Sequence, residues 1–352
     1  MSTVVVLGAG VCQVDLINYV ASKYNTLVIA PNRPINVRYN FQWICHDACD
    51  IRGIINFLKN IDIHSVITDQ SDHLTQTASI VSGHYNLPHI STNTLKYYCN
   101  KHSMYRLCKQ YNIPTPSVKK ILRGTEYINS NSNSMVVKPV IGSNSKSIHV
   151  VEPAGSVVIT TDSLVQPLLQ GTEITIEGVC MNGEHTSIIV GVKSHSQFAV
   201  ANKISYSTAN NSKYKHILKY NDMFVSFTNL QNGLTHSEWV VNDSGNFNLI
   251  DFACRGGGCN IASRVLPEFI SPTPYELLYA RELKTINKTD STYNVTVLYP
   301  KVNDIQSFNN IKNKYVDVLD SHIVPDNFDN MSVVDKTHRP GWLIVKESVD
   351  DF

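Results

Sequence analysis

The sequence lacks a long apolar run, an excess of charge of either sign and a clustered cysteine pattern. No apolar stretch in its 352 residues approaches the length of a membrane span, so no membrane partner is expected. The 30 Lys and Arg balance 29 Asp and Glu, and a net charge of +1 argues against a nucleic-acid partner. The eight cysteines are scattered, which is typical of reduced thiols and predicts a cytoplasmic location.

Two familiar site patterns are present only in part. Glycines at 8 and 10 follow a predicted strand, but the third glycine of a dinucleotide fingerprint would fall on Gln13, and no acidic residue closes the next strand. A nicotinamide-dependent enzyme is therefore the weaker alternative, and a plain turn explains these glycines as well. Cys45 and Cys49 flank His46 without a second ligand pair of matching spacing, so no metal site is expected there.

The first 93 residues alternate predicted strands with predicted helices. In chain order these are a strand at 3–8, a helix at 13–22, a strand at 26–30, a helix at 51–60 and a strand at 64–69. Such alternation predicts a parallel sheet with crossover helices in a Rossmann-like unit. Further on we predict a helix at 93–111, strands at 136–140, 163–169 and 173–180, a helix at 274–284, and strands at 294–300 and 342–348. The fold class is therefore α/β together with α+β.

The most informative segment is residues 233–261, GLTHSEWVVNDSGNFNLIDFACRGGGCNI. Two strands joined by a turn at 242–245 would place Glu238 beside Asp251, and adjacent carboxylates repel each other unless a cation lies between them. Carboxylate oxygens suit Mg²⁺, which in proteins usually accompanies a nucleoside triphosphate. Arg255 and three glycines follow directly, and an arginine suits a group that gains negative charge during a reaction. The alternative is a hairpin with an exposed salt bridge.

A second candidate site is the loop at 141–147, Ile-Gly-Ser-Asn-Ser-Lys-Ser, which follows a strand that contains Lys138. Small residues allow phosphate oxygens to approach the backbone, and the lysine can place its ammonium group on the same phosphates. A surface hairpin has the same composition, so this loop alone decides nothing. Lys146 could reach the terminal phosphate or stay solvated, and Glu177 and Lys193 are either pocket residues or charges at a sheet edge.

These motifs, in this order, resemble those of the ATP-grasp ligases, including the bacilysin-type L-amino-acid ligases and the enzymes related to biotin carboxylase and carbamoyl-phosphate synthetase. The resemblance covers nearly the whole chain. It implies an ATP-grasp fold with a Rossmann-like domain at 1–95, a small ATP-lid lobe at 96–170, a large antiparallel lobe at 171–290 and a C-terminal subdomain at 291–352. The sequence departs from the family at Asp251-Phe252-Ala253, where Glu-x-Asn is common, so the metal geometry is open.

The resemblance also implies a role for each motif residue. The implied ATP-binding residues are Lys101, Lys138, Ser143, Ser145, Gln166, Pro167, Leu169 and Glu173, of which Gln166, Pro167 and Leu169 would meet adenine and Glu173 the ribose. The implied metal ligands are Glu238 and Asp251, and Arg255 would steady an acyl phosphate. His236, Gly256, Gly257 and Asn260 are weaker substrate-binding candidates, and His236 could equally be a packing residue.

The implied activity is a ligation that uses ATP and Mg²⁺ or Mn²⁺. A carboxylate becomes an acyl phosphate, an amine displaces the phosphate, and ADP and phosphate are released. The expected partners are therefore small carboxylate and amine substrates. The oligomeric state is left open, with a homodimer as one alternative. The alternative is a catalytically inactive ATP sensor of the same fold, suggested by the departures at Asp251 and Ala253.

Overall fold

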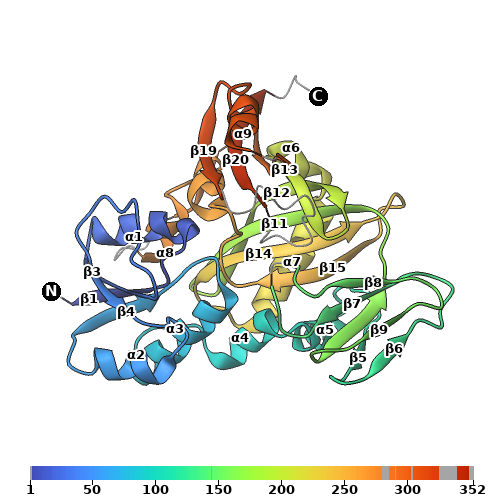
Figure 1. Cartoon of the computed structure of the whole chain (residues 1–352), viewed down its shortest axis with the longest axis horizontal. Helices are drawn as coiled ribbons and strands as arrows, with labels where there is room; N and C mark the ends of the chain where they lie inside the picture. The colour runs from blue at the N-terminus through green and yellow to red at the C-terminus, as the bar shows by residue number, and fades with distance from the viewer. Residues whose placement is uncertain are drawn as a thin grey trace.

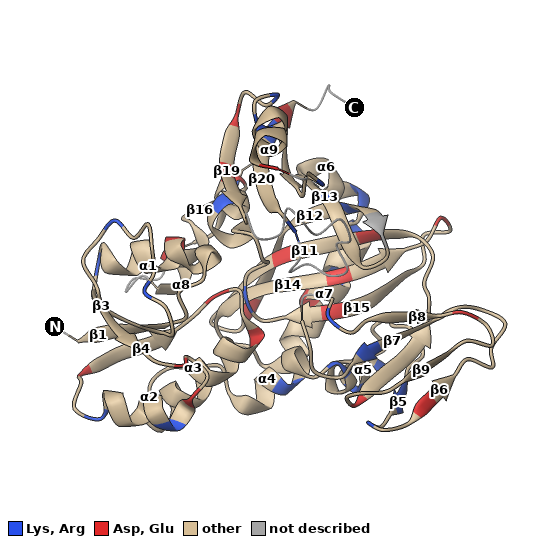
Figure 2. Cartoon of the chain, viewed as in Figure 1, with Lys and Arg blue, Asp and Glu red and all other residues tan. Residues whose placement is uncertain are grey.

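A computed structural model of the chain describes residues 2–143, 145–279, 285–289, 291–302, 304–324 and 339–348. Figure 1 shows three units, with the N-terminal unit on the left, a small β lobe at the lower right and a large sheet between and above them. Basic and acidic side chains are interspersed in this view, in keeping with the near-zero net charge (Figure 2). Within the described residues, no helix is both long and apolar enough to cross a membrane.

The N-terminal unit is the predicted parallel sheet with helices. Its four strands run in the order β3-β2-β1-β4, and all three pairings are parallel. Strand β1 is buried at every position, as expected for a strand covered on both faces. The elements are β1 (Thr3–Leu7), η1 (Val11–Gln13), α1 (Val14–Ala21), β2 (Asn25–Ala30), β3 (Gln42–Cys45), α2 (Ile51–Leu58), β4 (Ile63–Ile67) and α3 (Asp72–His84).

The turn after β1 is filled by the side chain of Gln13. Its amide oxygen accepts a hydrogen bond from Gly10 N at 2.9 Å, and its amide nitrogen donates to Thr68 Oγ1 and Asp69 O, both at 3.2 Å. A Cβ on Gly8, whose φ is +91°, would lie 2.5 Å from this amide. A glutamine amide therefore occupies the space above the turn, which counts against a dinucleotide site there.

The single helix predicted over 93–111 is wrong. The chain forms α4 (Thr92–Cys99) and α5 (Lys101–Gln110), separated by Asn100 in an extended conformation with φ −126° and ψ 102°. The Asn100 side chain accepts a hydrogen bond from Ser103 N at 3.0 Å, as expected of an N-cap residue. This break makes Lys101 the first residue of a new helix and turns its side chain toward the other units.

The small lobe is built on a four-stranded sheet in the order β5-β10-β7-β8, whose pairings are all antiparallel. Its core consists of Ile121, Val137, Val151, Ile159 and Val165. The elements are β5 (Lys119–Ile121), β7 (Met135–Pro139), β8 (His149–Val151) and β10 (Ser163–Pro167), with a second pair, β6 (Glu126–Ile128) and β9 (Ser156–Val158).

The large sheet has eight strands in the order β15-β14-β11-β12-β13-β18-β20-β19, with antiparallel pairings throughout. Its strands are β11 (Thr172–Met181), β12 (Glu184–Gln197), β13 (Val200–Ser207), β14 (Gly233–Val241), β15 (Phe247–Ala253), β18 (Tyr293–Leu298), β19 (Val318–Ile323) and β20 (Gly341–Ser348). The C-terminal strands thus continue the same sheet, and the predicted domain boundaries stay a prediction.

Helices and short elements complete the large unit. They are α6 (Thr208–Lys213), α7 (Lys215–Thr228), η2 (Ile261–Val265), η3 (Leu266–Glu268), β16 (Ile270–Ser271), α8 (Pro274–Tyr279), β17 (Asn287–Lys288) and α9 (Ile305–Lys312). Helix α8 covers the start of the helix predicted at 274–284, and positions 280–284 lie outside the described residues. Helix α7 packs on β11 and β12 and buries Ile217, Phe224 and Val225 in the second core.

Candidate active site

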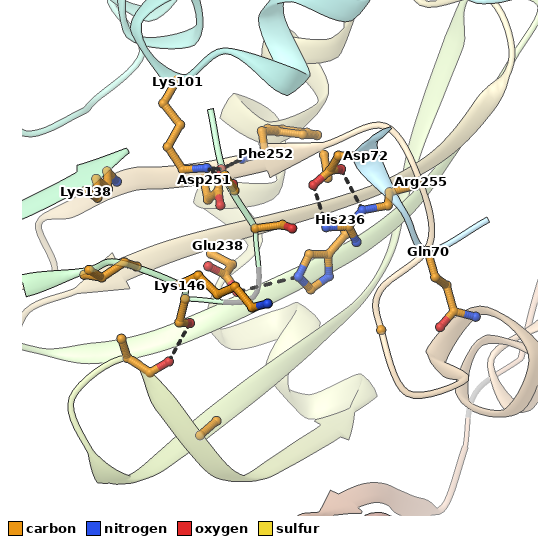
Figure 3. A pocket seen from close by; sticks show the side chains of 18 of the residues that line it. Gln70, Asp72, Lys101, Lys138, Lys146, His236, Glu238, Asp251, Phe252 and Arg255 are labelled. Carbon is orange, nitrogen blue, oxygen red and sulfur yellow. Dashed lines mark hydrogen bonds and ion pairs between the residues drawn. The ribbon is translucent and has the colours of Figure 1, made fainter. Parts of the chain in front are cut away.

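A cavity of about 330 Å³ lies where the three units meet (Figure 3). The N-terminal unit contributes Gln70 and Asp72, and the small lobe contributes Lys138 with residues 141–143, 145 and 146 of the following loop. The hairpin β14–β15 contributes the acidic pair. Predicted site residues that line this cavity are Lys101, Lys138, Ser143, Ser145, Glu173, His236, Glu238, Asp251 and Arg255. Segments far apart in the sequence therefore converge on one charged cavity.

The hairpin β14–β15 pairs the two predicted metal ligands. Glu238 lies opposite Asp251 in the strand register, and Gly245 N donates to Asn242 O at 2.9 Å within the turn. Lysines stand beside both carboxylates: Lys101 Nζ lies 3.2 Å from Asp251 Oδ1, and Lys193 Nζ contacts Glu238 Oε1. The predicted adjacency is confirmed, and the like charges are compensated by cations of the chain itself.

Lys193 bridges two acidic side chains from different strands. Its ammonium group contacts both Glu173 and Glu238, and His195 Nε2 lies 3.0 Å from the second oxygen of Glu173. Burial alone would lower the pKa of Lys193, but the two carboxylates outweigh burial and raise its pKa above the usual range. Strand β12 lies between β11 and β13, so the interpretation of Lys193 as a sheet-edge charge is wrong.

Lys138 is buried and lines the cavity. Its ammonium group donates to Tyr105 Oη at 2.9 Å and to the carbonyl oxygen of Ile250 at 2.8 Å. Neither partner carries a charge, and burial lowers the pKa of Lys138 to about 8. The charge of this lysine therefore depends on pH in a range accessible to experiment.

ATP affinity is expected to fall as the pH rises through about 8, because Lys138 loses the proton that makes it attractive to phosphate. Calorimetric titration with ATP between pH 7 and pH 9.5 measures this. Lys138→Gln should bind weakly throughout, without that decline, and a constant wild-type affinity up to pH 9.5 would contradict the prediction.

The stability of the protein depends on Lys138 with the opposite sign. Because the pKa of this lysine is lower in the folded than in the unfolded protein, its contribution to the free energy of unfolding increases from about pH 8 to about pH 10.5.

Arg255 is engaged by the N-terminal unit. Its Nε donates to Asp72 Oδ1 at 2.7 Å and its Nη2 to Asp72 Oδ2 at 3.2 Å, while Nη1 donates to the carbonyl oxygen of Gly256 at 3.0 Å. The two side chains are only 15% and 20% exposed, so the alternative of an exposed salt bridge does not hold. Burial would raise the pKa of Asp72, but Arg255 outweighs burial and lowers it.

The first two of the three glycines after Arg255 lie close to buried acidic side chains. Gly256 N donates to Asp69 Oδ1 at 2.8 Å, and a Cβ on Gly256 would lie 2.7 Å from Ala262 Cβ. A Cβ on Gly257 would lie 2.9 Å from Ile261 Cδ1 and 3.2 Å from Glu177 Oε2. At Gly258 the space is open, and this residue lines the cavity. Packing thus accounts for the first two glycines.

Gly256→Ala is expected to destabilise the protein by about 1–3 kcal/mol, because the added methyl group has no room beside Ala262 and Asp69. Gly258→Ala is the matched control and should change the free energy of unfolding by less than about 0.5 kcal/mol. Urea unfolding of the two variants measures the difference. Equal stabilities would show that the loop relaxes and that packing does not require the glycine.

His236 lies in the cavity on the same strand face as Glu238. Its Nδ1 is 2.8 Å from Glu177 Oε1, and its Nε2 is 3.7 Å from Glu238 Oε1. Burial would lower the pKa of His236, but the carboxylate of Glu177 outweighs burial and raises it. Glu177 also accepts a hydrogen bond from Tyr206 Oη at 3.1 Å. His236 is thus both a cavity residue and part of a buried network.

Comparisons with known proteins identify the fold. Residues 98–227 match the family model of the ATP-grasp domain. The chain has the ATP-grasp fold. An L-amino acid ligase from Bacillus licheniformis superposes with a TM-score of 0.76 at 14% identity, covering 99% of this chain and 94% of the ligase. No curated protein matches the sequence.

Two further structures with this fold contain nucleotides. N5-carboxyaminoimidazole synthetase from Staphylococcus aureus, complexed with ADP, has a TM-score of 0.71 at 12% identity and covers 98% of this chain and 93% of its own. Carboxyaminoimidazole ribonucleotide synthase from Aspergillus clavatus, complexed with ATP, has a TM-score of 0.75 at 10% identity, with 98% and 94% covered. The resemblance to ATP-grasp proteins and the predicted fold are confirmed.

Several predicted ATP-grasp site residues do not line the described cavity. They are Gln166, Pro167, Leu169, Gly256, Gly257 and Asn260. Gln166 is buried and accepts a hydrogen bond from Tyr105 Oη at 3.0 Å, and Asn260 Nδ2 donates to Asp320 Oδ2 at 2.9 Å. Asn144, at the centre of the predicted phosphate loop, lies outside the described residues.

Sequence reasoning missed the cavity residues of the N-terminal unit. Gln70 and Asp72 line the cavity and follow shortly after β4, at the carboxyl end of a parallel strand. Ligands of such sheets bind at that edge, so the acidic residues after a predicted strand were the available signal. Tyr105 was also missed, and its hydroxyl contacts Lys138 and Gln166.

The donor set fits magnesium only together with ATP. The described residues contain no group of three or more His, Cys, Asp or Glu able to hold a metal ion. Mg²⁺ usually takes one or two carboxylates and completes its shell with water and phosphate oxygens, and Glu238 and Asp251 supply such a pair. Ala253 adds no oxygen.

Proposed function

We propose that this protein is an ATP-dependent carboxylate–amine ligase, which activates a carboxylate as an acyl phosphate and couples it to an amine, with release of ADP and phosphate. The observation that carries the proposal is a single cavity that places an acidic cross-strand pair among several cationic groups. The acidic residues are Glu238 and Asp251, and the cationic ones are Lys101, Lys138, Lys193 and Arg255. The ATP-grasp domain match supports the same activity class.

Charge neutralisation is the main physical requirement of this reaction, because a carboxylate and a triphosphate repel each other. Lys101 and Lys138 would bind phosphate oxygens, and Arg255 would stabilise the acyl phosphate. Magnesium held by Glu238 and Asp251 would neutralise charge on the phosphates. When ATP binds, its phosphates would replace the carboxylates that now pair with Lys101 and Lys193.

Exclusion of water is the second requirement, because water would hydrolyse an acyl phosphate. The loop at 141–147 is held to both sides of the cavity. Lys101 Nζ donates to the carbonyl oxygen of Gly142 at 3.0 Å, and Ser145 Oγ donates to the carbonyl oxygen of Ala199 at 2.9 Å. We propose that this loop is the lid, and that Lys146, which lines the cavity, faces the nucleotide when the lid is closed.

The substrates are small molecules in this proposal. The L-amino acid ligase neighbour makes amino acids the first candidates for both the carboxylate and the amine. The scattered cysteines of the sequence predict a reducing, cytoplasmic setting. The homodimer stays a prediction.

A phosphate-release screen tests the proposal. The protein is incubated with ATP, Mg²⁺ or Mn²⁺, and pairs drawn from amino acids, uronic acids and simple amines. Release of ADP and phosphate that depends on both a carboxylate and an amine, with the coupled product seen by mass spectrometry, is the expected result. Release of ADP and phosphate at the same rate without the carboxylate and the amine would contradict ligation.

The inactive ATP sensor is the second candidate. The favouring observation is that Lys101 and Lys193 already pair with the acidic residues, while Ala253 offers no further metal ligand. Tight ATP binding that is unchanged by Mg²⁺, without turnover on any pair, would favour the sensor. Binding that strengthens with Mg²⁺ would favour the ligase.

A further inference from the structure

The connection between β4 and α3 holds the loop that carries Arg255. Asp69 accepts from Gly256 N at 2.8 Å, Gln70 Oε1 accepts from Asn260 N at 3.4 Å, and Asp72 binds the Arg255 guanidinium through both carboxylate oxygens. Asp72 is the first residue of α3, directly after its N-cap residue, so its position is fixed by a helix end. The N-terminal unit therefore sets the position of a loop that belongs to the large unit.

Counting donors shows which edge of Arg255 remains for a ligand. A guanidinium has five N–H groups, of which Nε–H and one on Nη2 go to Asp72, and one on Nη1 goes to Gly256 O. One N–H on each terminal nitrogen is left, and the Nη1–Nη2 end of a guanidinium suits a phosphate or carboxylate. Arg255 lines the cavity and Figure 3 shows it near His236, with the Asp72 contact on its other side.

A second cavity adjoins Arg255, so the contact with Asp72 affects which cavity its guanidinium faces. Arg255 also lines a cavity of about 710 Å³, which Asp69, Cys254 and Leu234 share. Asp72 is among the described residues that line the first cavity and not among those that line the second. Arg255 therefore borders both cavities, and its guanidinium is bound to Asp72, a residue that lines the first.

We propose that Asp72 is a positioning residue that holds Arg255 by its Nε–Nη2 edge, so that the end of the guanidinium formed by Nη1 and Nη2 faces a phosphate bound in the first cavity. This rests on the proposed ligase function. It makes the N-terminal unit part of the catalytic arrangement, because the large unit alone would leave Arg255 without its orienting partner.

Asp72→Asn and Asp72→Glu test the proposal, each assayed for ADP release and product. Asp72→Asn should lower kcat about 10- to 100-fold and change KM for ATP less than about twofold. The reason is that Asp72 orients Arg255 and does not itself bind ATP. Asp72→Glu keeps the charge and should recover part of kcat. Unchanged kcat in Asp72→Asn, or a loss confined to KM for ATP, would overturn the proposal.

Asp15→Asn is the matched control. Asp15 also links the N-terminal unit to an arginine of the large unit, with Arg264 Nη2 donating to Asp15 Oδ1 at 2.8 Å, and neither residue lines the described parts of either cavity. Its loss should affect stability as Asp72→Asn does and leave kcat unchanged. Equal losses of kcat in Asp15→Asn and Asp72→Asn would mean that both bridges only hold the units together, and would overturn the positioning role.

A binding measurement separates this proposal from the proposed function. Inorganic phosphate is titrated calorimetrically into the wild type and Asp72→Asn, each saturated with Mg-ADP. The positioning role predicts weaker phosphate binding in the variant, even if no substrate pair supports turnover. Tighter binding would show that Asp72 competes with phosphate for Arg255, and no phosphate binding by the wild type would leave Arg255 without the assigned ligand; either result overturns the proposal.

Discussion

Arg255→Ala is expected to lower kcat about 100- to 1,000-fold, which corresponds to about 2.7–4 kcal/mol of transition-state stabilisation. The reason is that the guanidinium lines the cavity beside the acidic pair and offers one edge to the charge that develops on the transferred phosphate. Steady-state ADP release, with the substrates identified by the phosphate-release screen, measures the effect. Turnover equal to that of the wild type would remove Arg255 from the mechanism.

Stability has to be measured alongside this variant. Loss of Arg255 leaves the Asp72 carboxylate without its partner in a largely covered position, which is itself destabilising. Arg255→Lys serves as the control, because it keeps a positive charge near Asp72 but lacks the planar fork. A folded Arg255→Lys protein with a similarly reduced kcat would show that geometry matters, whereas full activity would show that charge is sufficient.

Glu238→Gln and Asp251→Asn are each expected to reduce ATP turnover by at least about 100-fold, because each removes one of the two carboxylates that fit a metal ion. Asp251→Asn also removes the acidic partner of Lys101, whereas after Glu238→Gln Lys193 keeps its contact with Glu173. Turnover measured over a range of Mg²⁺ concentrations should show a higher Mg²⁺ requirement for whichever variant keeps activity.

Asp243→Asn is the control for these two variants. Asp243 lies in the turn of the same hairpin and is exposed, so its loss changes the local charge equally but touches neither strand face at the cavity. We expect wild-type turnover and the wild-type Mg²⁺ requirement. If Glu238→Gln and Asp251→Asn kept wild-type turnover as well, the acidic pair would have no role in metal binding.

The sequence was most informative where contacts are local or follow a fixed order. Alternating strands and helices predicted the parallel N-terminal sheet, and the ordered motifs predicted the ATP-grasp fold. The hairpin and its turn also follow from the sequence, but the turn register alone would place Glu238 opposite Ile250. A register shift between Glu238 and Trp239, which the sequence does not reveal, sets Glu238 opposite Asp251. The break at Asn100 was missed, although asparagine is a common N-cap residue, because the surrounding pattern is helical on both sides.

Long-range partners could not be predicted in this way. Asp72 lies 183 residues before Arg255, and no periodicity connects them. The sequence left two interpretations of Lys193 open, because its acidic partners Glu173 and Glu238 are brought beside it by two other strands. The glycines at 256 and 257 suggested room for a ligand, yet the room is taken by Asp69, Glu177 and their neighbours.

By itself, then, the sequence determined the class of fold and the acidic hairpin, since hydrophobic period and turn chemistry act over a few residues. Only the tertiary structure decided which cations compensate that hairpin and which edge of Arg255 is held. Those contacts depend on how three separately formed units pack together, and packing brings residues close without regard to their distance along the chain.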